Sequence, residues 1–108
     1  DDLRPLADLD SLRNLYLDDN RISDVSPLAQ LKQLKLLDLN DNKISDLQPL
    51  QALEQIEVLR LAQNQIADLG PIVNLPALSI LEIWGNPLNS ASQQHIAQLI
   101  QRGVEVQQ

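Results

Sequence analysis

The fold follows from the segment Leu9-Asp10-Ser11-Leu12-Arg13-Asn14-Leu15-Tyr16-Leu17-Asp18-Asp19-Asn20-Arg21-Ile22-Ser23-Asp24-Val25-Ser26-Pro27-Leu28. Its pattern returns along the chain with a period of 22 residues. The first leucine returns as Leu31, Leu53 and Leu75. The asparagine, the acid and the proline return in the same register, as Asn42, Asn64, Asn86, Asp46, Asp68, Pro49 and Pro71. A spacing held at so many positions is a tandem repeat, and such repeats stack into one elongated core.

Within each repeat, the segment around Leu15-Tyr16-Leu17 alternates apolar and variable residues, which is typical of a strand. Stacked repeats place these strands side by side in a parallel sheet, with neighbours about 4.8 Å apart. The inward side chains are predicted to be Leu15, Leu17, Leu37, Leu39, Leu59, Leu61, Leu81 and Ile83. An asparagine follows each strand, where its side chain can satisfy backbone groups of a buried turn. We therefore predict a structural ladder of Asn20, Asn42, Asn64 and Asn86.

The second half of each repeat, exemplified by Asp24-Val25-Ser26-Pro27-Leu28, predicts a short helical or 3-10 turn on the outer side. Asp24 fits an N-cap, and Pro27 sits early in the turn, where a missing N–H costs little. The alternative is that Asp2, Asp24, Asp46 and Asp68 form a metal ladder. Capping is favoured, since the acids occur once per repeat and always before the proline-containing turn.

The two ends of the array differ. Ser90-Ala91-Ser92-Gln93 has the spacing of a capping box, with Ser90 as N-cap and Gln93 reaching back. A helix with Arg102 in its last turn and Gly103 after it would follow, and Val104-Glu105-Val106 alternates like a last strand. Residues 1–8 match only the second half of a repeat, which leaves leucines such as Leu3 and Leu9 at an open edge. We expect truncation before Asp1, with a partner or a second copy on this edge as the alternative.

The pattern L-x-x-L-x-L-x-x-N-x-I/L is that of a leucine-rich repeat. The unit with Asn, then Ile, then Ser/Ala-Asp-Leu-x-Pro-Leu resembles the internalin-like subclass, and Asn86-Pro87-Leu88 with the following helix looks like the C-terminal cap of bacterial members. The resemblance implies a curved α/β repeat solenoid with a parallel concave β-sheet, short helical or 3-10 convex turns and a C-terminal capping helix, which binds proteins on its concave sheet. A single domain over 1–108 is predicted, with a partial repeat at 1–8, repeats at 9–30, 31–52, 53–74 and 75–88, and a cap at 89–108.

Composition narrows the classes of partner. The net charge is -7 and the pI is about 4.4, which argues against nucleic acid and against an anionic membrane. No apolar run approaches the roughly 20 residues of a membrane span. There is no cysteine, so neither a disulfide framework nor a thiolate metal site is expected.

Catalytic, metal and cofactor sites are not predicted. Nucleophilic catalysis needs a base beside its nucleophile, and the single histidine, His95, has no acid at helical spacing. No glycine-rich phosphate loop or H-x-x-x-H spacing occurs. The acidic residues that follow the first two strands could alternatively bind a hard cation, because such cations take oxygen ligands. That set is Asp18, Asp19, Asp38, Asn40 and Asp41, and a solvated acidic surface is favoured.

A partner-binding surface is predicted on the concave side of the sheet, where both aromatic residues fall. Its residues are Tyr16, Asp18, Leu36, Asp38, Asn40, Val58, Arg60, Ile80, Glu82 and Trp84, with Asn14 and Ala62 also pointing outward. Binding hot spots favour Trp, Tyr and Arg, and contiguous exposed apolar residues mark contact surfaces. The alternative is that these residues have no binding role and occur here because β-branched and aromatic residues have a high propensity for strands.

The predicted function is a non-enzymatic module that binds a protein or an extended peptide. A structural spacer, or a C-terminal fragment of a longer array that self-associates through its N-terminal edge as a homodimer, is the alternative. The bacterial character of the cap points to a secreted or cell-surface protein.

Overall fold

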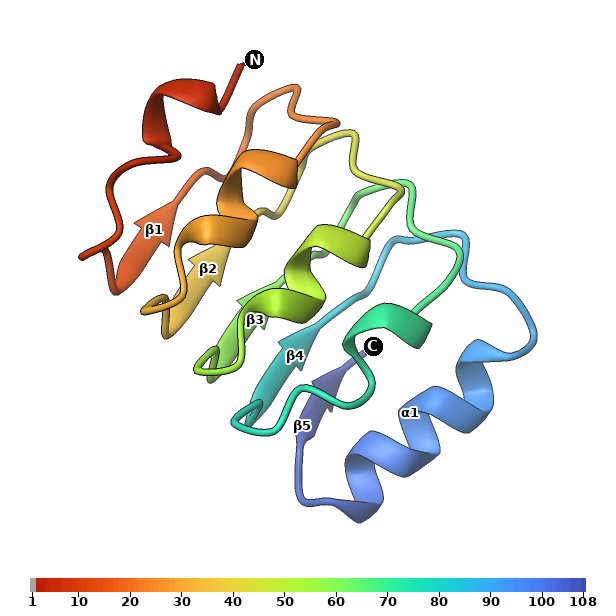
Figure 1. Ribbon diagram of the computed structural model, residues 1–108. Helices are drawn as coiled ribbons and strands as arrows, with labels where there is room; N and C mark the ends of the chain where they lie inside the picture. Colours follow the sequence, from red (N-terminus) through yellow and green to blue (C-terminus); the bar gives the residue numbers. More distant parts are fainter. Residues whose placement is uncertain (1) are drawn as a thin grey trace.

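The computed structural model describes residues 2–108 as a stack of coils, with all strands on one side and the short helical turns on the other (Figure 1). One parallel sheet contains, in chain order, β1 (Asn14–Tyr16), β2 (Leu36–Asp38), β3 (Val58–Arg60), β4 (Ile80–Glu82) and β5 (Glu105–Gln107). The opposite side contains the 3-10 helices η1 (Arg4–Leu6), η2 (Ser26–Gln30), η3 (Gln48–Ala52) and η4 (Gly70–Ile72), and α1 (Ser92–Gln101) lies at the C-terminal end. The predicted fold class is confirmed.

Equivalent residues of successive repeats lie side by side in the sheet. Leu37 of β2 pairs with Leu15 of β1 and with Leu59 of β3, each 22 positions away. The backbone ladder continues just beyond each strand, where the Leu39 N–H donates to the Arg60 carbonyl at 2.8 Å. One sequence period is therefore one turn of the coil, and each turn presents the same positions to its neighbours.

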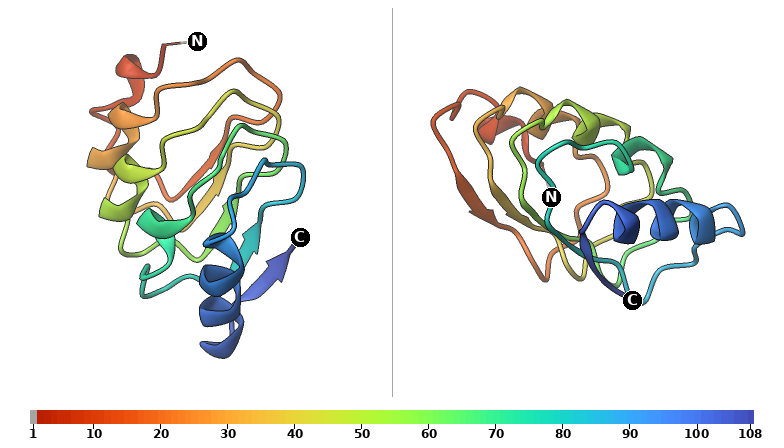
Figure 2. Two further views of the ribbon diagram at one scale, coloured as in Figure 1. Left: turned by 90° about the vertical axis from the view of Figure 1, so that its right-hand side faces the viewer. Right: turned by 90° about the horizontal axis from the view of Figure 1, so that it is seen from below.

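The buried residues form one core cluster, enclosed between the strand layer and the 3-10 layer, and Figure 2 shows these two layers. The inward residues of the middle coils, such as Leu37, Leu59 and Leu81, are fully buried. Leu15 and Leu17 of the first coil are only partly buried. Burial in a repeat array depends on neighbours on both sides, and no described coil precedes β1.

An aspartate precedes each outer turn, as predicted, but it lies one position before the N-cap residue instead of being the N-cap itself. The N-cap of η2 is Val25, and the carboxylate of Asp24 accepts from the Ser26 N–H at 2.9 Å. Asp46 and Asp68 accept from Gln48 and Gly70 at 2.9 and 2.8 Å. Each acid therefore makes an Asx turn, and this hydrogen bond lowers the pKa of the Asp24 carboxyl.

A left-handed residue recurs in the turn after each of the first four strands. Asp19, Asp41 and Gln63 have φ values of 61°, 58° and 57°, and Gly85 has 77°. A Cβ atom added at Gly85 would lie 3.0 Å from the Gln63 Cγ. Glycine therefore suits this position for two reasons, its backbone conformation and the closeness of the preceding turn.

The predicted capping box at α1 is wrong. The helix begins at Ser92, so Ser90 lies in the preceding turn, and Asn89 accepts from the Ser92 N–H at 3.2 Å through its Oδ1. The Ser92 hydroxyl is buried and reaches the Ala67 carbonyl of the previous coil at 3.3 Å. The helix start is thus fixed by Asn89 together with a contact to the array.

The C-terminal end of α1 agrees with the prediction for Gly103. Gly103 has φ 90°, and the Val104 N–H donates to the Leu99 carbonyl at 2.9 Å, which completes a Schellman motif. Arg102 is the C-cap residue rather than part of the last turn. Its guanidinium donates to the carbonyls of Val73 and Leu75 and so joins α1 to the segment between η4 and β4.

Candidate partner-binding face

The outward side of the sheet, here called the concave face, is organised in rows because equivalent residues pair across neighbouring strands. The first row is Asn14, Leu36, Val58, Ile80 and Glu105. The second row is Tyr16, Asp38, Arg60, Glu82 and Gln107. The third row, just after the strands, is Asp18, Asn40, Ala62 and Trp84. Parallel pairing in register brings together residues that lie 22 positions apart in the chain.

The two aromatic residues are the most exposed large apolar side chains on this face. Tyr16 is 58% exposed on β1, and Trp84 is 43% exposed just after β4. They belong to different rows, and three strand spacings, roughly 15 Å in all, separate their strands. The aromatics therefore mark two separated points of the concave face, with the side chains of β2 and β3 between them.

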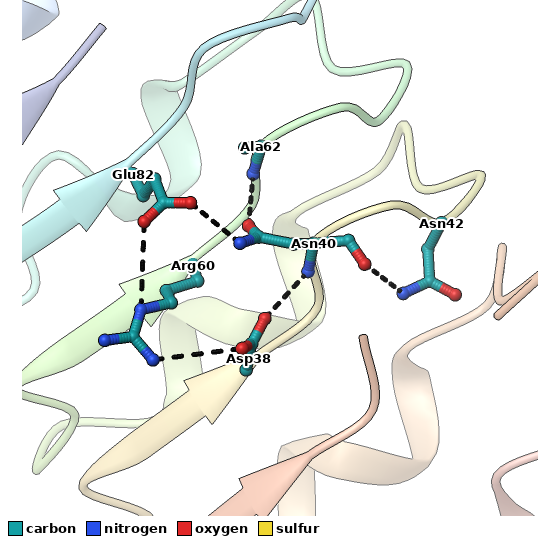
Figure 3. A network of polar contacts seen from close by, with 6 residues as sticks. All are labelled: Asp38, Asn40, Asn42, Arg60, Ala62 and Glu82. Carbon is teal, nitrogen blue, oxygen red and sulfur yellow. Dashed lines mark hydrogen bonds and ion pairs between the residues drawn. The ribbon is translucent and has the colours of Figure 1, made fainter. Parts of the chain in front are cut away.

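Between these points, four polar side chains form a connected network (Figure 3). Arg60 lies between two acids, with its Nη1 3.8 Å from Asp38 Oδ2 and its Nε 3.8 Å from Glu82 Oε2. The Asn40 amide donates to Glu82 Oε1 at 2.7 Å, and the Asn40 backbone N–H donates to Asp38 Oδ1 at 3.1 Å. The carboxylates are mostly covered, since the side chains of Asp38 and Glu82 are 13% and 15% exposed.

This network changes the role predicted for Arg60. As a hot-spot candidate Arg60 would offer its charge to a partner, but its guanidinium lies between two carboxylates of its own chain. The group Asp38, Arg60 and Glu82 keeps one net negative charge, with each acid oriented by a second contact. Sequence reasoning placed these residues on one face but did not detect the network, because its members come from three different repeats.

The apolar part of the face is smaller than predicted. Leu36, Val58 and Ile80 are only partly exposed in the first row. Ala62 was expected to point outward but is fully buried, and the Asn40 Oδ1 accepts from its N–H at 2.7 Å. The larger Asn40 side chain of the preceding coil extends toward Ala62. The Ala62 side chain is only a methyl group, so it leaves room for this approach.

The asparagine ladder lies beside this face, and Asn42, Asn64 and Asn86 each join a coil to the one before it. The Asn64 Nδ2 group donates to Leu39, Leu61 and Ala62 carbonyls at 2.9, 3.1 and 3.2 Å. Its Oδ1 accepts from the Ile44 N–H at 3.0 Å. Buried backbone groups of two coils are therefore satisfied by one side chain.

Residues considered for other chemistry are dispersed. No group of three or more His, Cys, Asp or Glu side chains between residues 2 and 108 is arranged to hold a metal ion. Within the same range, the buried Nδ1 of His95 has no hydrogen-bond partner, so the ring lacks the acid that orients a catalytic histidine. No helix in the described part of the chain is long and apolar enough to cross a bilayer.

Comparisons with known proteins agree with this architecture. The family model for leucine-rich repeats (2 copies) matches residues 10–52, and no curated protein sequence matches the chain. An internalin (inlF) of Listeria monocytogenes is similar over 98% of this chain, with 32% identity and a TM-score of 0.91. Internalin C2 (inlC2) of the same organism is similar over 97%, with 34% identity and a TM-score of 0.80. A leucine-rich repeat protein of Leptospira interrogans covers 95% at 27% identity, with a TM-score of 0.83.

The chain spans only part of these structures, namely 31% of the inlF chain, 44% of the inlC2 chain and 27% of the Leptospira chain. The likeness therefore concerns the repeat array and its C-terminal end. Proteins built from such repeats are typically protein-interaction modules. By its repeat pattern, its match to the repeat model over residues 10–52 and its fold, the chain is a leucine-rich repeat solenoid whose array is similar to those of the Listeria internalins.

Proposed function

We propose that this chain is a non-catalytic module that binds an extended segment of another protein along its concave face. The observation that carries the proposal is the pair Tyr16 and Trp84, which stay 58% and 43% exposed at separated points of that face. Exposed aromatic side chains offer a large apolar area to a partner, and Trp and Tyr are enriched among the residues that dominate binding energy. Their separation, about 15 Å, suits a peptide segment crossing the strands better than one small molecule.

Charge favours a basic partner. Four acids of the concave face, Asp18, Asp38, Glu82 and Glu105, outnumber its one cation, Arg60. The whole chain has a net charge of -7, so the field around the molecule attracts cationic segments before contact. We further propose that the protein acts at the surface of a bacterium or after secretion, as its internalin-like character suggests.

The test compares three baits for capture of proteins from bacterial and host-cell extracts. The first is the original chain, the second is the double variant Tyr16→Ala/Trp84→Ala, and the third is the control Ile100→Ala. Ile100 is 52% exposed on α1, outside the concave face, and so controls for the loss of an exposed apolar side chain elsewhere on the molecule. Arg60 is left unchanged, because its removal would leave Asp38 and Glu82 unpaired.

The expected result is one protein retained by the original and the Ile100→Ala baits and lost from the double variant. Each aromatic hot spot contributes about 1 kcal/mol or more to the binding free energy, so removing both should raise the dissociation constant at least about 30-fold. Equal retention by all three folded baits would reject the concave face as the binding site. Circular dichroism of each bait checks that the fold is intact.

A further inference from the structure

Near the middle of the concave face, Arg60 is held between two carboxylates without being hydrogen-bonded to either. Its contacts to Asp38 Oδ2 and Glu82 Oε2 are both 3.8 Å long, beyond the roughly 2.7–3.2 Å of an N–H···O hydrogen bond. Among residues 2–108 the guanidinium makes no hydrogen bond, and 36% of the side chain is exposed. Its N–H donors are therefore open to a group from outside the chain.

Each of the two carboxylates has one oxygen in use and one oxygen open. Asp38 Oδ1 accepts from the Asn40 backbone N–H at 3.1 Å, and Glu82 Oε1 accepts from the Asn40 Nδ2 at 2.7 Å. The other oxygen of each acid lies on the side of Arg60 (Figure 3). Within the described part of the chain, neither of these oxygens accepts a hydrogen bond. Oriented acceptors therefore lie next to the open donors of Arg60.

A partner group that matches this arrangement must offer an acceptor to Arg60 and a donor to an open carboxylate oxygen. It must also carry no negative charge, because Asp38, Arg60 and Glu82 together already have one net negative charge. A primary carboxamide meets these conditions, since its oxygen accepts and its NH2 group donates. A carboxylate offers only acceptors and adds a like charge, while an ammonium offers only donors and leaves Arg60 without an acceptor. Polar groups covered without partners are costly, so the carboxamide is the group that this surface favours.

We propose that Asp38, Arg60 and Glu82 form a subsite for an asparagine or glutamine side chain of the partner. This inference rests on the proposed function, because it requires an extended segment that crosses the strands. In such a segment residues i, i+2 and i+4 point to one side, and i and i+4 lie roughly 13 Å apart. Apolar residues at i and i+4 would reach Tyr16 and Trp84, and residue i+2 would face Arg60. The expected partner motif therefore has Asn or Gln midway between two apolar residues.

The alternative is that the three residues only brace β2, β3 and β4 against one another. Arginine–carboxylate pairs that hold a surface together are frequently short and bidentate, whereas both distances here are 3.8 Å. A bracing role would also make no distinction between partner side chains. Selectivity for the central residue of a bound peptide therefore separates the two interpretations.

The probe is a phage-displayed library of peptides of about nine residues, with two leucines fixed about four positions apart and all other positions random. Peptides are selected on the original chain, and those that also bind Tyr16→Ala/Trp84→Ala are removed. We expect Asn and Gln to be enriched at the position midway between the leucines. One selected peptide is then synthesised with Gln, Glu or Lys at that position. Fluorescence anisotropy at high salt, which screens the long-range field, gives the three dissociation constants.

The original chain should bind the Gln peptide at least about tenfold more tightly than the Glu or Lys peptide. Asp38→Asn/Glu82→Gln keeps the acceptor oxygens that Asn40 uses but leaves the charge of Arg60 uncompensated. This variant should instead prefer the Glu peptide.

The matched control is Asp10→Asn/Glu54→Gln, which removes the same two charges from exposed positions outside the concave face. It should keep the preference for the Gln peptide. Circular dichroism checks that each variant is folded.

The two proposals fail in different ways. If every selected peptide binds Tyr16→Ala/Trp84→Ala as tightly as the original chain, the concave face is not the binding site and the proposed function is contradicted. If binding needs the aromatics but Asp38→Asn/Glu82→Gln leaves the order of the three peptides unchanged, the proposed function stands and the carboxamide subsite is overturned. Tightest binding of the Lys or Glu peptide to the original chain would also overturn the subsite.

Discussion

At the scale of single residues, the asparagine ladder concentrates stability in a few side chains. Asn64 is buried and makes hydrogen bonds to backbone groups of two coils, while Asn20 is exposed and makes them within one coil. We predict that Asn64→Ala lowers the free energy of unfolding by about 3 kcal/mol, since buried carbonyls and an N–H lose their partners at ~1–3 kcal/mol each. Asn20→Ala should cost about 1 kcal/mol or less, because water reaches its partners. Urea unfolding of both variants gives the comparison, and equal losses would contradict it.

The aspartates of the outer turns make stability depend on pH in a defined direction. The hydrogen bond from the Ser26 N–H lowers the pKa of Asp24 in the folded chain. Its contribution is therefore present above the unfolded pKa, about 3.9, and is lost as the pH falls through the lower folded value. Asp24→Asn keeps an acceptor oxygen but cannot titrate.

We predict that the original chain loses stability relative to Asp24→Asn as the pH is lowered below about 4. The measurement is urea unfolding of both proteins between neutral pH and pH 2. A constant difference across this range would refute the effect. Asp2 provides a second check by NMR titration, since hydrogen bonds from the Arg4 side chain and backbone lower its pKa to about 2.

The left-handed turn position gives a third prediction at this scale. Gly85→Ala should destabilise the chain by about 1–2 kcal/mol, from the positive φ and from the 3.0 Å approach to the Gln63 Cγ. Gly103→Ala, where φ is also positive but nothing lies within 4 Å of the added atom, should cost less. Adding Gln63→Ala should recover part of the Gly85→Ala loss, because it removes the Cγ atom. Thermal unfolding of the three variants measures this order.

At the scale of elements, α1 is held to the array by an arginine at its end. Arg102 donates to the carbonyls of Val73 and Leu75, in the segment between η4 and β4. We predict that Arg102→Gln lowers stability by about 1–3 kcal/mol, as expected for hydrogen bonds from a charged donor. Amide exchange should rise first in α1 and β5. Uniformly faster exchange across β1 to β4 would instead indicate global destabilisation.

The sequence predicted some parts of this cap and not others, for physical reasons. Gly103 was predictable because a helix end requires a left-handed residue and glycine provides it. Asn89 was missed because Ser90 and Gln93 have the spacing of a capping box, and local spacing alone does not show which turn the array contacts. The partners of Arg102 lie 29 and 27 residues earlier in the chain, beyond any local pattern.

At the scale of the whole molecule, periodicity made the sheet and the rows of the concave face predictable from the sequence. A period of 22 residues fixes which residues lie side by side. It does not fix how unlike side chains in one row interact. The positions of Asp38, Arg60 and Glu82 followed from the repeat, but their mutual pairing and the burial of Ala62 under Asn40 depend on the particular side chains of neighbouring coils.

Net charge leads to a prediction about association kinetics. With a charge of -7, the association rate constant for a basic partner should fall about tenfold as salt is raised from about 50 to 500 mM. Asp18→Asn/Glu105→Gln should lower this rate at low salt, while Tyr16→Ala/Trp84→Ala should mainly raise the dissociation rate. Stopped-flow measurements with the captured partner give the association and dissociation rate constants separately. An association rate independent of salt would exclude electrostatic steering.

The asparagine contacts between coils also have a consequence for how the length of such a protein can evolve. Asn42, Asn64 and Asn86 each join only adjacent coils. A recombination event that duplicates or deletes one whole 22-residue unit in frame therefore preserves the type of contact between the coils that remain. Such an event adds or removes one residue in each row of the concave face. The gene can therefore lengthen or shorten the recognition surface stepwise, with point substitutions afterwards adjusting what the new row contacts.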